Sequence, residues 1–209
     1  MSKVVFYTAT SLNGYIADEA NSLEWLFAVE APDWQQYEEF FDAVGAMVEG
    51  STTYEWVLNF EGLLEQPEKW KELYGSRRTF VFTSRDLPKP DGADVQFVSG
   101  GVADAFPAIA EAAGDKDIWV VGGGDLAGQF LDAGLLTELQ ISVAPVALTG
   151  GAPLLPRRIE SDRLKLRSVE KMGQFAHMTY DVVPPAGPHP APGTATATAT
   201  AMAMATAEA

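Results

Sequence analysis

Three consecutive glycines have the most readily interpreted chemistry in this sequence. They follow an apolar stretch over residues 118–121, which is expected to form a buried strand, and a helix is expected to begin at once, over 125–133. Glycine lets a ligand approach the backbone closely, and the first turn of a helix presents unpaired N–H groups with a partial positive charge. The turn is therefore a candidate phosphate or pyrophosphate site, although a ligand-free turn would have the same composition. The candidate residues are Gly122, Gly123, Gly124, Asp125 and Leu126.

The glycines and Ala127 also match the pattern G-x-G-x-x-A of Rossmann dinucleotide sites. Two features argue against a Rossmann domain. The motif lies late in the chain, and the next expected strand, over 139–146, ends without the acidic residue that would hold a ribose. The sequence has no G-x-x-x-x-G-K-[ST] motif, which argues against a P-loop NTPase.

A second polar cluster follows the strand expected over residues 78–83. Thr83, Ser84 and Arg85 combine two hydroxyls with a guanidinium. These groups make charge-assisted hydrogen bonds to phosphate. The same residues would suit an ordinary polar loop, so the cluster is a second candidate phosphate site with a plain structural alternative.

The composition restricts the remaining chemistry. The chain has no cysteine and only two histidines, which excludes thiolate nucleophiles and cysteine metal sites and makes a Ser-His-Asp hydrolase or a zinc site unexpected. The formal net charge of −15 disfavours a nucleic-acid partner. The sequence contains no run of about 18 apolar residues and no signal-peptide pattern. We therefore expect a cytoplasmic protein without a membrane partner.

Strands and helices alternate along residues 1–183, which we expect to form one α/β domain with a mostly parallel sheet flanked by helices. Strands are expected over 4–10, 15–17, 46–49, 78–83, 95–98, 117–121 and 139–146, and helices over 33–44, 52–59, 67–74, 102–113 and 125–133. Two final strands, over 164–171 and 175–183, predict an antiparallel C-terminal hairpin. Residues 184–209 are rich in proline, alanine and threonine and are expected to form a disordered tail.

Several segments together resemble the reductase domain of the bacterial riboflavin-biosynthesis deaminase-reductase, a branch of the dihydrofolate reductase superfamily. The longest, over residues 120–156, reads VVGGGDLAGQFLDAGLLTELQISVAPVALTGGAPLLP. Shorter matches are TATSLNGYIAD over 8–18, EGSTTYEW over 49–56 and QFAHMTYDVV over 174–183. The resemblance spans most of residues 3–183.

The resemblance implies a dihydrofolate reductase-like fold that binds NADPH. In that family the glycine turn contacts the cofactor, and the segment corresponding to Thr83, Ser84 and Arg85 holds the adenosine 2′-phosphate. Ser51 and Thr52 lie in the family's G-R-x-T-Y element and are further candidate cofactor contacts.

The resemblance also implies a substrate side. Asn13 lies in the family's S-L-D-G element, and Trp25, which follows it, is either a core residue or a ring that stacks on a flat heterocycle. Asp33 lies roughly where dihydrofolate reductases carry their substrate-binding carboxylate. It suits the N-cap of the helix over 33–44 equally well.

Two departures from the family pattern bear on function. Ser51 replaces an arginine and Asn13 replaces an aspartate, so that a phosphate contact and a carboxylate are lost. The expected function is NADPH-dependent reduction of a pterin-like or ribosylaminopyrimidine-like heterocycle. This activity would be related to that of the 5-amino-6-(5-phosphoribosylamino)uracil reductase of riboflavin biosynthesis, in a homodimer. The alternative is a non-catalytic nucleotide- or heterocycle-binding protein that kept the fold.

Overall fold

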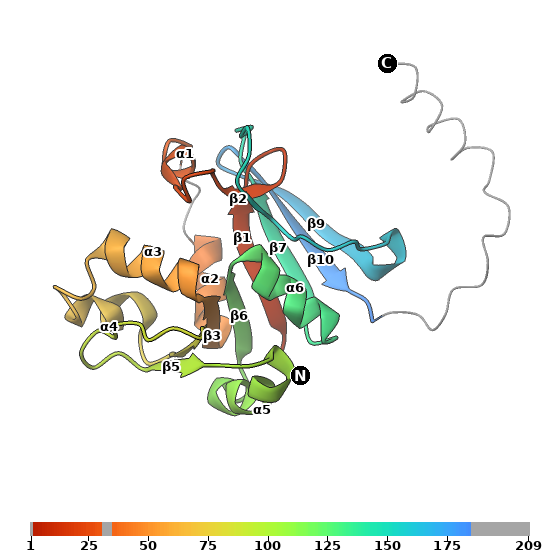
Figure 1. Cartoon of the computed structure of the whole chain (residues 1–209). Coiled ribbons are helices and arrows are strands. Elements are labelled where there is room, and N and C mark those ends of the chain that lie inside the picture. Colours follow the sequence, from red (N-terminus) through yellow and green to blue (C-terminus); the bar gives the residue numbers. More distant parts are fainter. Residues whose placement is uncertain (1, 31–34, 185–209) are drawn as a thin grey trace, which may run out of the picture.

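The computed structural model describes residues 2–30 and 35–184 (Figure 1). An eight-stranded sheet forms its centre, in the order β5-β4-β3-β6-β1-β7-β10-β9. These strands are β1 (Val4–Thr10), β3 (Val44–Gly50), β4 (Arg78–Phe82), β5 (Val95–Val98), β6 (Asp117–Gly122), β7 (Glu138–Val143), β9 (Leu164–Met172) and β10 (Phe175–Val182). The first six strands of that order pair in parallel, whereas β10 is antiparallel to both β7 and β9. The predicted mostly parallel sheet with an antiparallel C-terminal hairpin is confirmed.

Helices cover both faces of the sheet. They are α1 (Glu24–Phe27), α2 (Gln35–Ala43), α3 (Ser51–Glu61), α4 (Glu68–Tyr74), α5 (Val102–Ala113) and α6 (Gly124–Asp132), with a 3₁₀ turn over Ser161–Arg163. Ile109 of α5 and Phe130 of α6 pack with Val48 and Phe6 in the main core. Because successive side chains of a strand point to opposite faces of the sheet, Val81 lies on the other face, where it packs under α3 and α4. The aromatic residues of α2 also lie on this second face, because Phe40 packs edge-on against Trp119 of β6 with ring centroids 5.4 Å apart.

The connections create a topological switch point between β3 and β6, which are neighbours in the sheet. β3 runs directly into α3 on one face, and β6 runs through the glycine turn into α6 on the other face. In open α/β sheets, ligands bind in the crevice that forms where adjacent strands send their helices to opposite sides. The fold therefore places its crevice at the C-terminal ends of β3 and β6.

Several boundaries differ from the sequence expectation for identifiable reasons. The strand expected to reach residue 146 ends at Val143, since Pro145 has no N–H with which to continue the ladder. The expected strand over 15–17 is confirmed as β2 (Tyr15–Ala17), and it pairs with β8 (Ala152–Pro153), which the sequence did not predict. The predicted tail over 184–209 lies outside the described residues apart from Pro184, which is exposed. In the described part of the chain, no helix is long and apolar enough to cross a bilayer.

Candidate functional site

A cleft of about 480 Å³, here called the glycine pocket, occupies the switch point. Its residues come mainly from the two strand-to-helix junctions, with Thr8 of β1, Ile16 of β2, Trp56 of α3 and Phe82 of β4 around them. The junction residues are Gly50, Ser51, Thr52 and Thr53 after β3, and Gly122, Gly123, Gly124, Asp125 and Leu126 around the end of β6. The structure thus brings together the glycine turn, Ser51 and Thr52, which the sequence had proposed as separate cofactor contacts.

The N-termini of α3 and α6 both open into the glycine pocket. Their N-cap residues are Gly50 and Gly123, and neither helix has a side-chain hydrogen bond capping its first turn. The uncapped N–H groups of two helices, each with the positive end of a macrodipole, therefore border one cleft. This arrangement suits two linked phosphate groups, because each helix start can bind an anion without help from a basic side chain.

Gly123 and Gly124 have different roles in the turn. A side chain at Gly124 would overlap the carbonyl oxygens of Pro153 and Leu154, so this glycine permits the close approach of β8. Gly123 has φ −87° and ψ −176°, an extended conformation that any residue adopts. A Cβ atom at Gly123 would meet only the Ile16 Cδ1 atom, at 3.9 Å. Gly123 therefore leaves open the space in front of the α6 N-terminus. The peptide bond that joins it to Gly122 is cis.

Asp125 places a carboxylate at the edge of the same pocket, where it would repel a phosphate if unpaired. Its Oδ2 atom accepts a hydrogen bond of 3.0 Å from Gln129, and its Oδ1 atom one of 3.0 Å from Arg157. These two interactions hold the pKa of Asp125 below its usual value. Arg157 also binds Asp132 at 2.7 Å. One guanidinium on the neighbouring loop thus pairs with two carboxylates and offsets the Asp125 charge only in part.

Thr83, Ser84 and Arg85 lie beyond the glycine pocket, on the loop that continues β4 past the lining residue Phe82. The guanidinium of Arg85 forms a two-pronged ion pair with Glu55 of α3, in which Nη1 donates to Oε1 at 3.0 Å. Thr83 Oγ1 accepts a hydrogen bond of 2.9 Å from the Arg85 backbone N–H. A phosphate on this loop would have to compete with Glu55 for the guanidinium.

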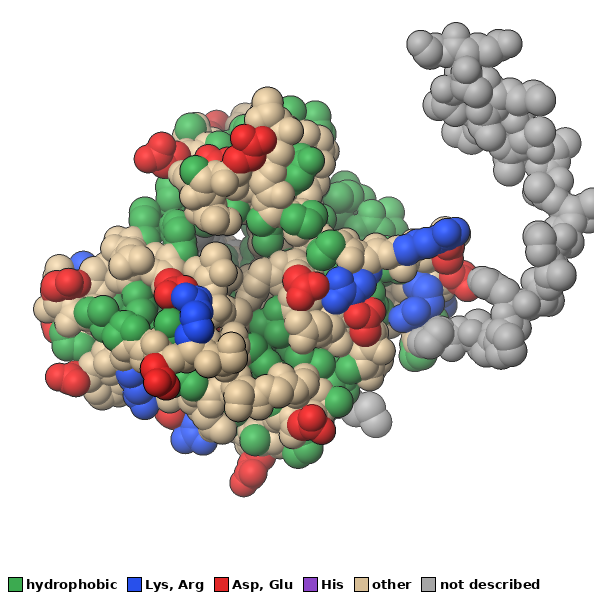
Figure 2. All heavy atoms as spheres, viewed as in Figure 1, with side chains coloured by type: hydrophobic (Ala, Val, Ile, Leu, Met, Phe, Trp, Pro, Cys, Tyr) green, Lys and Arg blue, Asp and Glu red, His purple; other side chains and the backbone are tan. Residues whose placement is uncertain are grey.

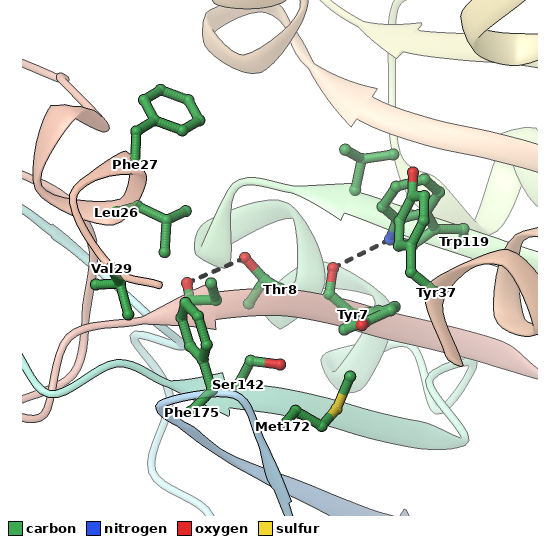
Figure 3. A pocket seen from close by; sticks show the side chains of 12 residues that line it. Tyr7, Thr8, Leu26, Phe27, Val29, Tyr37, Trp119, Ser142, Met172 and Phe175 are labelled. Atoms are coloured by element: carbon green, nitrogen blue, oxygen red, sulfur yellow. Dashed lines mark hydrogen bonds between the residues drawn. The ribbon is translucent and has the colours of Figure 1, made fainter. Parts of the chain in front are cut away.

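A second cavity of about 390 Å³, here called the aromatic pocket, adjoins the glycine pocket (Figure 3). The two cavities share Thr8 and Val121, so they meet above the neighbouring strands β1 and β6. Leu26, Phe27 and Val29 lie on one side of the aromatic pocket, and Tyr37 and Trp119 on the other (Figure 3). The remaining lining residues are Tyr7, Ala9, Ser142, Met172 and Phe175.

One wall of the aromatic pocket carries linked polar groups. The Ser142 hydroxyl and the Nδ1 atom of His177 are 2.9 Å apart, and the Tyr7 ring stands edge-on to the imidazole with centroids 5.5 Å apart. Burial lowers the pKa of His177, an effect that Glu170 on the paired strand partly offsets. Burial also raises the pKa of Tyr7, against a smaller opposing contribution from Ser142. Near neutral pH this wall therefore presents uncharged donors and acceptors.

A stack of three aromatic rings joins the outer walls of the two pockets. Phe27 of α1 lines the aromatic pocket and stacks on Phe60 of α3, with ring centroids 5.1 Å apart. Phe60 stacks in turn on Trp56, at 4.7 Å, and Trp56 lines the glycine pocket. The short helix α1 is thereby held against α3 across the junction of the cavities. Figure 2 shows the molecule hollowed between the lobe that carries α1 and the rest of the fold.

The structure gives the two proposed substrate residues structural contacts. The Asn13 side chain bridges two loops, because its Nδ2 atom donates to the Leu148 carbonyl at 2.7 Å and its Oδ1 atom accepts from the Leu148 N–H at 3.0 Å. An aspartate could not make the first of these bonds. Trp25 packs against Met172 and Phe175, and its Nε1 atom is buried without a hydrogen-bond partner. Asp33, the proposed catalytic carboxylate, lies outside the described residues.

Sequence reasoning missed the aromatic pocket and its polar wall. The one signal in the sequence was His177, which is one of only two histidines in the chain. In the structure it is 7% exposed. Its partner Ser142 is directly opposite in the β7–β10 register, which pattern alone does not reveal. In the described part of the chain, no group of three or more His, Asp or Glu side chains is arranged to hold a metal ion.

Known proteins with similar sequences or folds agree with this architecture. The chain is 30% identical over 178 residues to the Bacillus subtilis (strain 168) protein named "Uncharacterized protein YwjB", covering 85% of this chain and 97% of that protein. A crystal structure described as a putative riboflavin biosynthesis protein from Shewanella sp. PV-4 aligns with a TM-score of 0.68 and 29% identity. That alignment covers 88% of this chain and all of the other.

Two more distant structures share the fold. One is a Thermotoga maritima diaminohydroxyphosphoribosylaminopyrimidine deaminase/5-amino-6-(5-phosphoribosylamino)uracil reductase, with a TM-score of 0.62 and 15% identity over 87% of this chain and 57% of that chain. The other is the Enterococcus faecalis dihydrofolate reductase complexed with NADP(H) and RAB-propyl, with a TM-score of 0.54 and 17% identity over 86% and 96%. The pattern of the RibD C-terminal domain matches residues 2–178. The chain therefore belongs to the RibD C-terminal domain family and has the fold shared by RibD reductases and dihydrofolate reductases.

Proposed function

We propose that this protein is an NADPH-dependent reductase of a flat heterocycle. In this proposal the cofactor's pyrophosphate binds in the glycine pocket and the heterocycle binds in the aromatic pocket. The observation that carries the proposal is that the two cavities meet at Thr8 and Val121. An anion-binding site and an apolar site thus share one junction, as a two-substrate reductase requires.

The residues of the glycine pocket fit a dinucleotide. The backbone N–H groups at the starts of α3 and α6 would hold the two phosphates, with Ser51 and Thr52 contributing hydroxyls. Gly123 leaves the space in front of α6 free of side-chain atoms. When bound, the cofactor supplies the hydride. The polypeptide then has to orient the reacting carbon and to exclude water.

The aromatic pocket supplies the orientation. Trp119 is fixed by a hydrogen bond of 3.1 Å from its Nε1 atom to the Tyr7 carbonyl, drawn as a dashed line in Figure 3, so its ring forms a fixed wall for a flat ligand. The hydroxyls of Tyr7 and Ser142 would bind the polar edge of the heterocycle. His177 lies behind Ser142 and would help to carry a proton to or from that edge.

The alternative is a non-catalytic nucleotide- or heterocycle-binding protein. The ion pair between Arg85 and Glu55 favours this alternative, since it occupies the guanidinium proposed for the 2′-phosphate. The replacement of the family's arginine by Ser51 removes another basic contact.

Cofactor consumption separates the two candidates. NADPH oxidation at 340 nm should depend on both the protein and a heterocycle when dihydropterins and ribosylaminopyrimidines are supplied at millimolar concentration. Saturable NADPH binding without consumption for any of these compounds would favour the non-catalytic binder. The absence of saturable NADPH binding would contradict the reductase and a nucleotide-binding role, and would leave only the heterocycle-binding form of the alternative.

A further inference from the structure

We infer that the aromatic pocket takes an uncharged flat heterocycle that carries no phosphate, in contrast to the phosphoribosyl compound in the name of the Thermotoga maritima reductase. The inference rests on the proposed function, because it names the class of substrate for the same site. It follows from the charge and chemistry of the groups that surround this cavity.

The polar groups that line the cavity are neutral. Among the described residues, its polar side chains are the hydroxyls of Tyr7, Thr8, Tyr37 and Ser142. Burial raises the pKa of both tyrosines, which therefore stay protonated at neutral pH. Hydroxyls donate to and accept from the edge of a heterocycle, whereas a buried phosphate dianion needs compensating positive charge.

An exposed carboxylate lies next to one of the residues that line the pocket. Val29 and Phe175 line the cavity from different segments of the chain. Their neighbours in the sequence are Glu30 and Gln174, and the Gln174 Nε2 atom donates a hydrogen bond of 3.4 Å to the Glu30 carboxylate. Glu170 lies further along the hairpin, opposite His177. A phosphate projecting from a heterocycle past Val29 would therefore meet the carboxylate of Glu30.

Two basic side chains near the cavity have other contacts, although the charge of Arg77 also acts on the lining residue Tyr37 and lowers its pKa against the larger effect of burial. The Arg77 guanidinium lies 3.8 Å from the Phe41 ring centroid and donates hydrogen bonds to the carbonyls of Phe41, Val44 and Tyr74. Lys171 is opposite Ala176 in the hairpin and comes directly before Met172, which lines the cavity. Because successive side chains of a strand point to opposite faces, the Lys171 side chain extends from the face away from the cavity. The sequence segments outside the described range, 31–34 and 185–209, contain no lysine or arginine.

The test uses the full chain and a matched pair of ligands, 5-amino-6-ribosylaminouracil with and without its 5-phosphate. Their dissociation constants are measured by calorimetry on protein saturated with NADP⁺, which cannot reduce the ligands, after the binding of NADPH itself has been shown separately. We expect the phosphate-free compound to bind at least about tenfold more tightly. Tighter binding of the phosphorylated compound, or failure of both this uncharged nucleoside and an uncharged dihydropterin to bind at millimolar concentration, would overturn the inference. Failure of NADPH to bind would count against the proposed function instead.

A charge introduced at the mouth provides a second readout. Phe27 lines the aromatic pocket and Phe60 does not, yet both are 55% exposed and stack on each other. Phe27→Lys should shift the ratio of the two dissociation constants several-fold toward the phosphorylated compound, because it adds a cation at the mouth. Phe60→Ala, which disrupts the same stack without adding a charge, should leave the ratio unchanged. Equal shifts in the two variants would contradict a local electrostatic cause.

Discussion

Glu49 is the most unusual ionisable residue of the fold. It is fully buried at the end of β3, one residue before the glycine pocket, and its Oε2 atom has no hydrogen-bond partner. Burial raises its pKa to about 8. Between about pH 4.5 and 8 the folded protein therefore keeps a proton that the unfolded chain releases.

This difference in protonation makes stability depend on pH. Because the folded state binds the additional proton, the free energy of unfolding should fall as pH rises through this window, by about 1.4 kcal/mol per pH unit from this group. Glu49→Gln should remove that contribution and flatten the dependence, as measured by urea unfolding at pH 5.5 and pH 8. The exposed Glu72→Gln is the charge-matched control and should keep the wild-type slope. Identical slopes for wild type and Glu49→Gln would show that Glu49 does not titrate as described.

The ion pair between Arg85 and Glu55 bears on cofactor preference. If Arg85 binds the 2′-phosphate, Glu55→Ala should tighten NADPH binding by about two- to fivefold, the range expected for an exposed pair, and leave NADH binding unchanged. Glu61→Ala, on the same helix, is the control. The affinities are measured by fluorescence titration. An equal effect on the binding of the two cofactors would show that Arg85 does not contact the 2′-phosphate.

At this scale the position of the glycine turn could be predicted from the sequence, whereas the side chains that meet in the aromatic pocket could not. Gly123 and Asp125 are local features, since a strand followed at once by a helix fixes their position. Ser142 and His177 become neighbours only through the pairing of β7 with β10. Asn13 aligned with a family element, but its contacts with Leu148 depend on a loop 135 residues away.

At the scale of elements, the pattern of apolar residues was sufficient to predict most of the sheet. β1, β5 and α5 have the bounds expected from the sequence, because long periodic runs are flanked there by clear turns. β8 was missed because its two residues pair only through the loop that returns to β2. The aromatic pocket could not be predicted, since its walls come from seven segments between β1 and β10.

The stack of Phe27, Phe60 and Trp56 is a contact between helices α1 and α3 that joins the walls of the two pockets. α1 has only four residues and no side-chain cap, so its position depends on tertiary contacts. Phe27 provides such a contact through Phe60 and Trp56. The walls of both cavities therefore depend on one exposed cluster of rings.

At the scale of the whole molecule, acidic and basic side chains are interspersed over the face shown in Figure 2, despite the net charge of −15. In our proposal, anion binding in the glycine pocket would therefore depend on local helix dipoles rather than on the overall field. The homodimer implied by the family resemblance stays a prediction.

Removal of the C-terminal segment tests the domain boundary. Residues 185–209 are composed mainly of proline, alanine, threonine and glycine, a composition with little apolar surface to bury. Their deletion should leave the melting temperature within error of the full chain. A decrease of several degrees would show that the segment packs on the domain and that residue 184 is not its boundary.

The affinity of the Gly123→Val variant for NADPH tests the central claim most directly. Trp56 and Trp119 line the two pockets, so tryptophan quenching reports on occupancy. Gly101→Val is the matched control, because Gly101 is also a helix N-cap with an extended backbone, at φ −80° and ψ 153°, but lies before α5. We predict that Gly123→Val weakens NADPH binding about 100-fold, through the loss of roughly two charge-assisted hydrogen bonds, and that Gly101→Val binds as wild type does. Wild-type affinity in a folded Gly123→Val protein would show that the cofactor's phosphates do not bind at the start of α6.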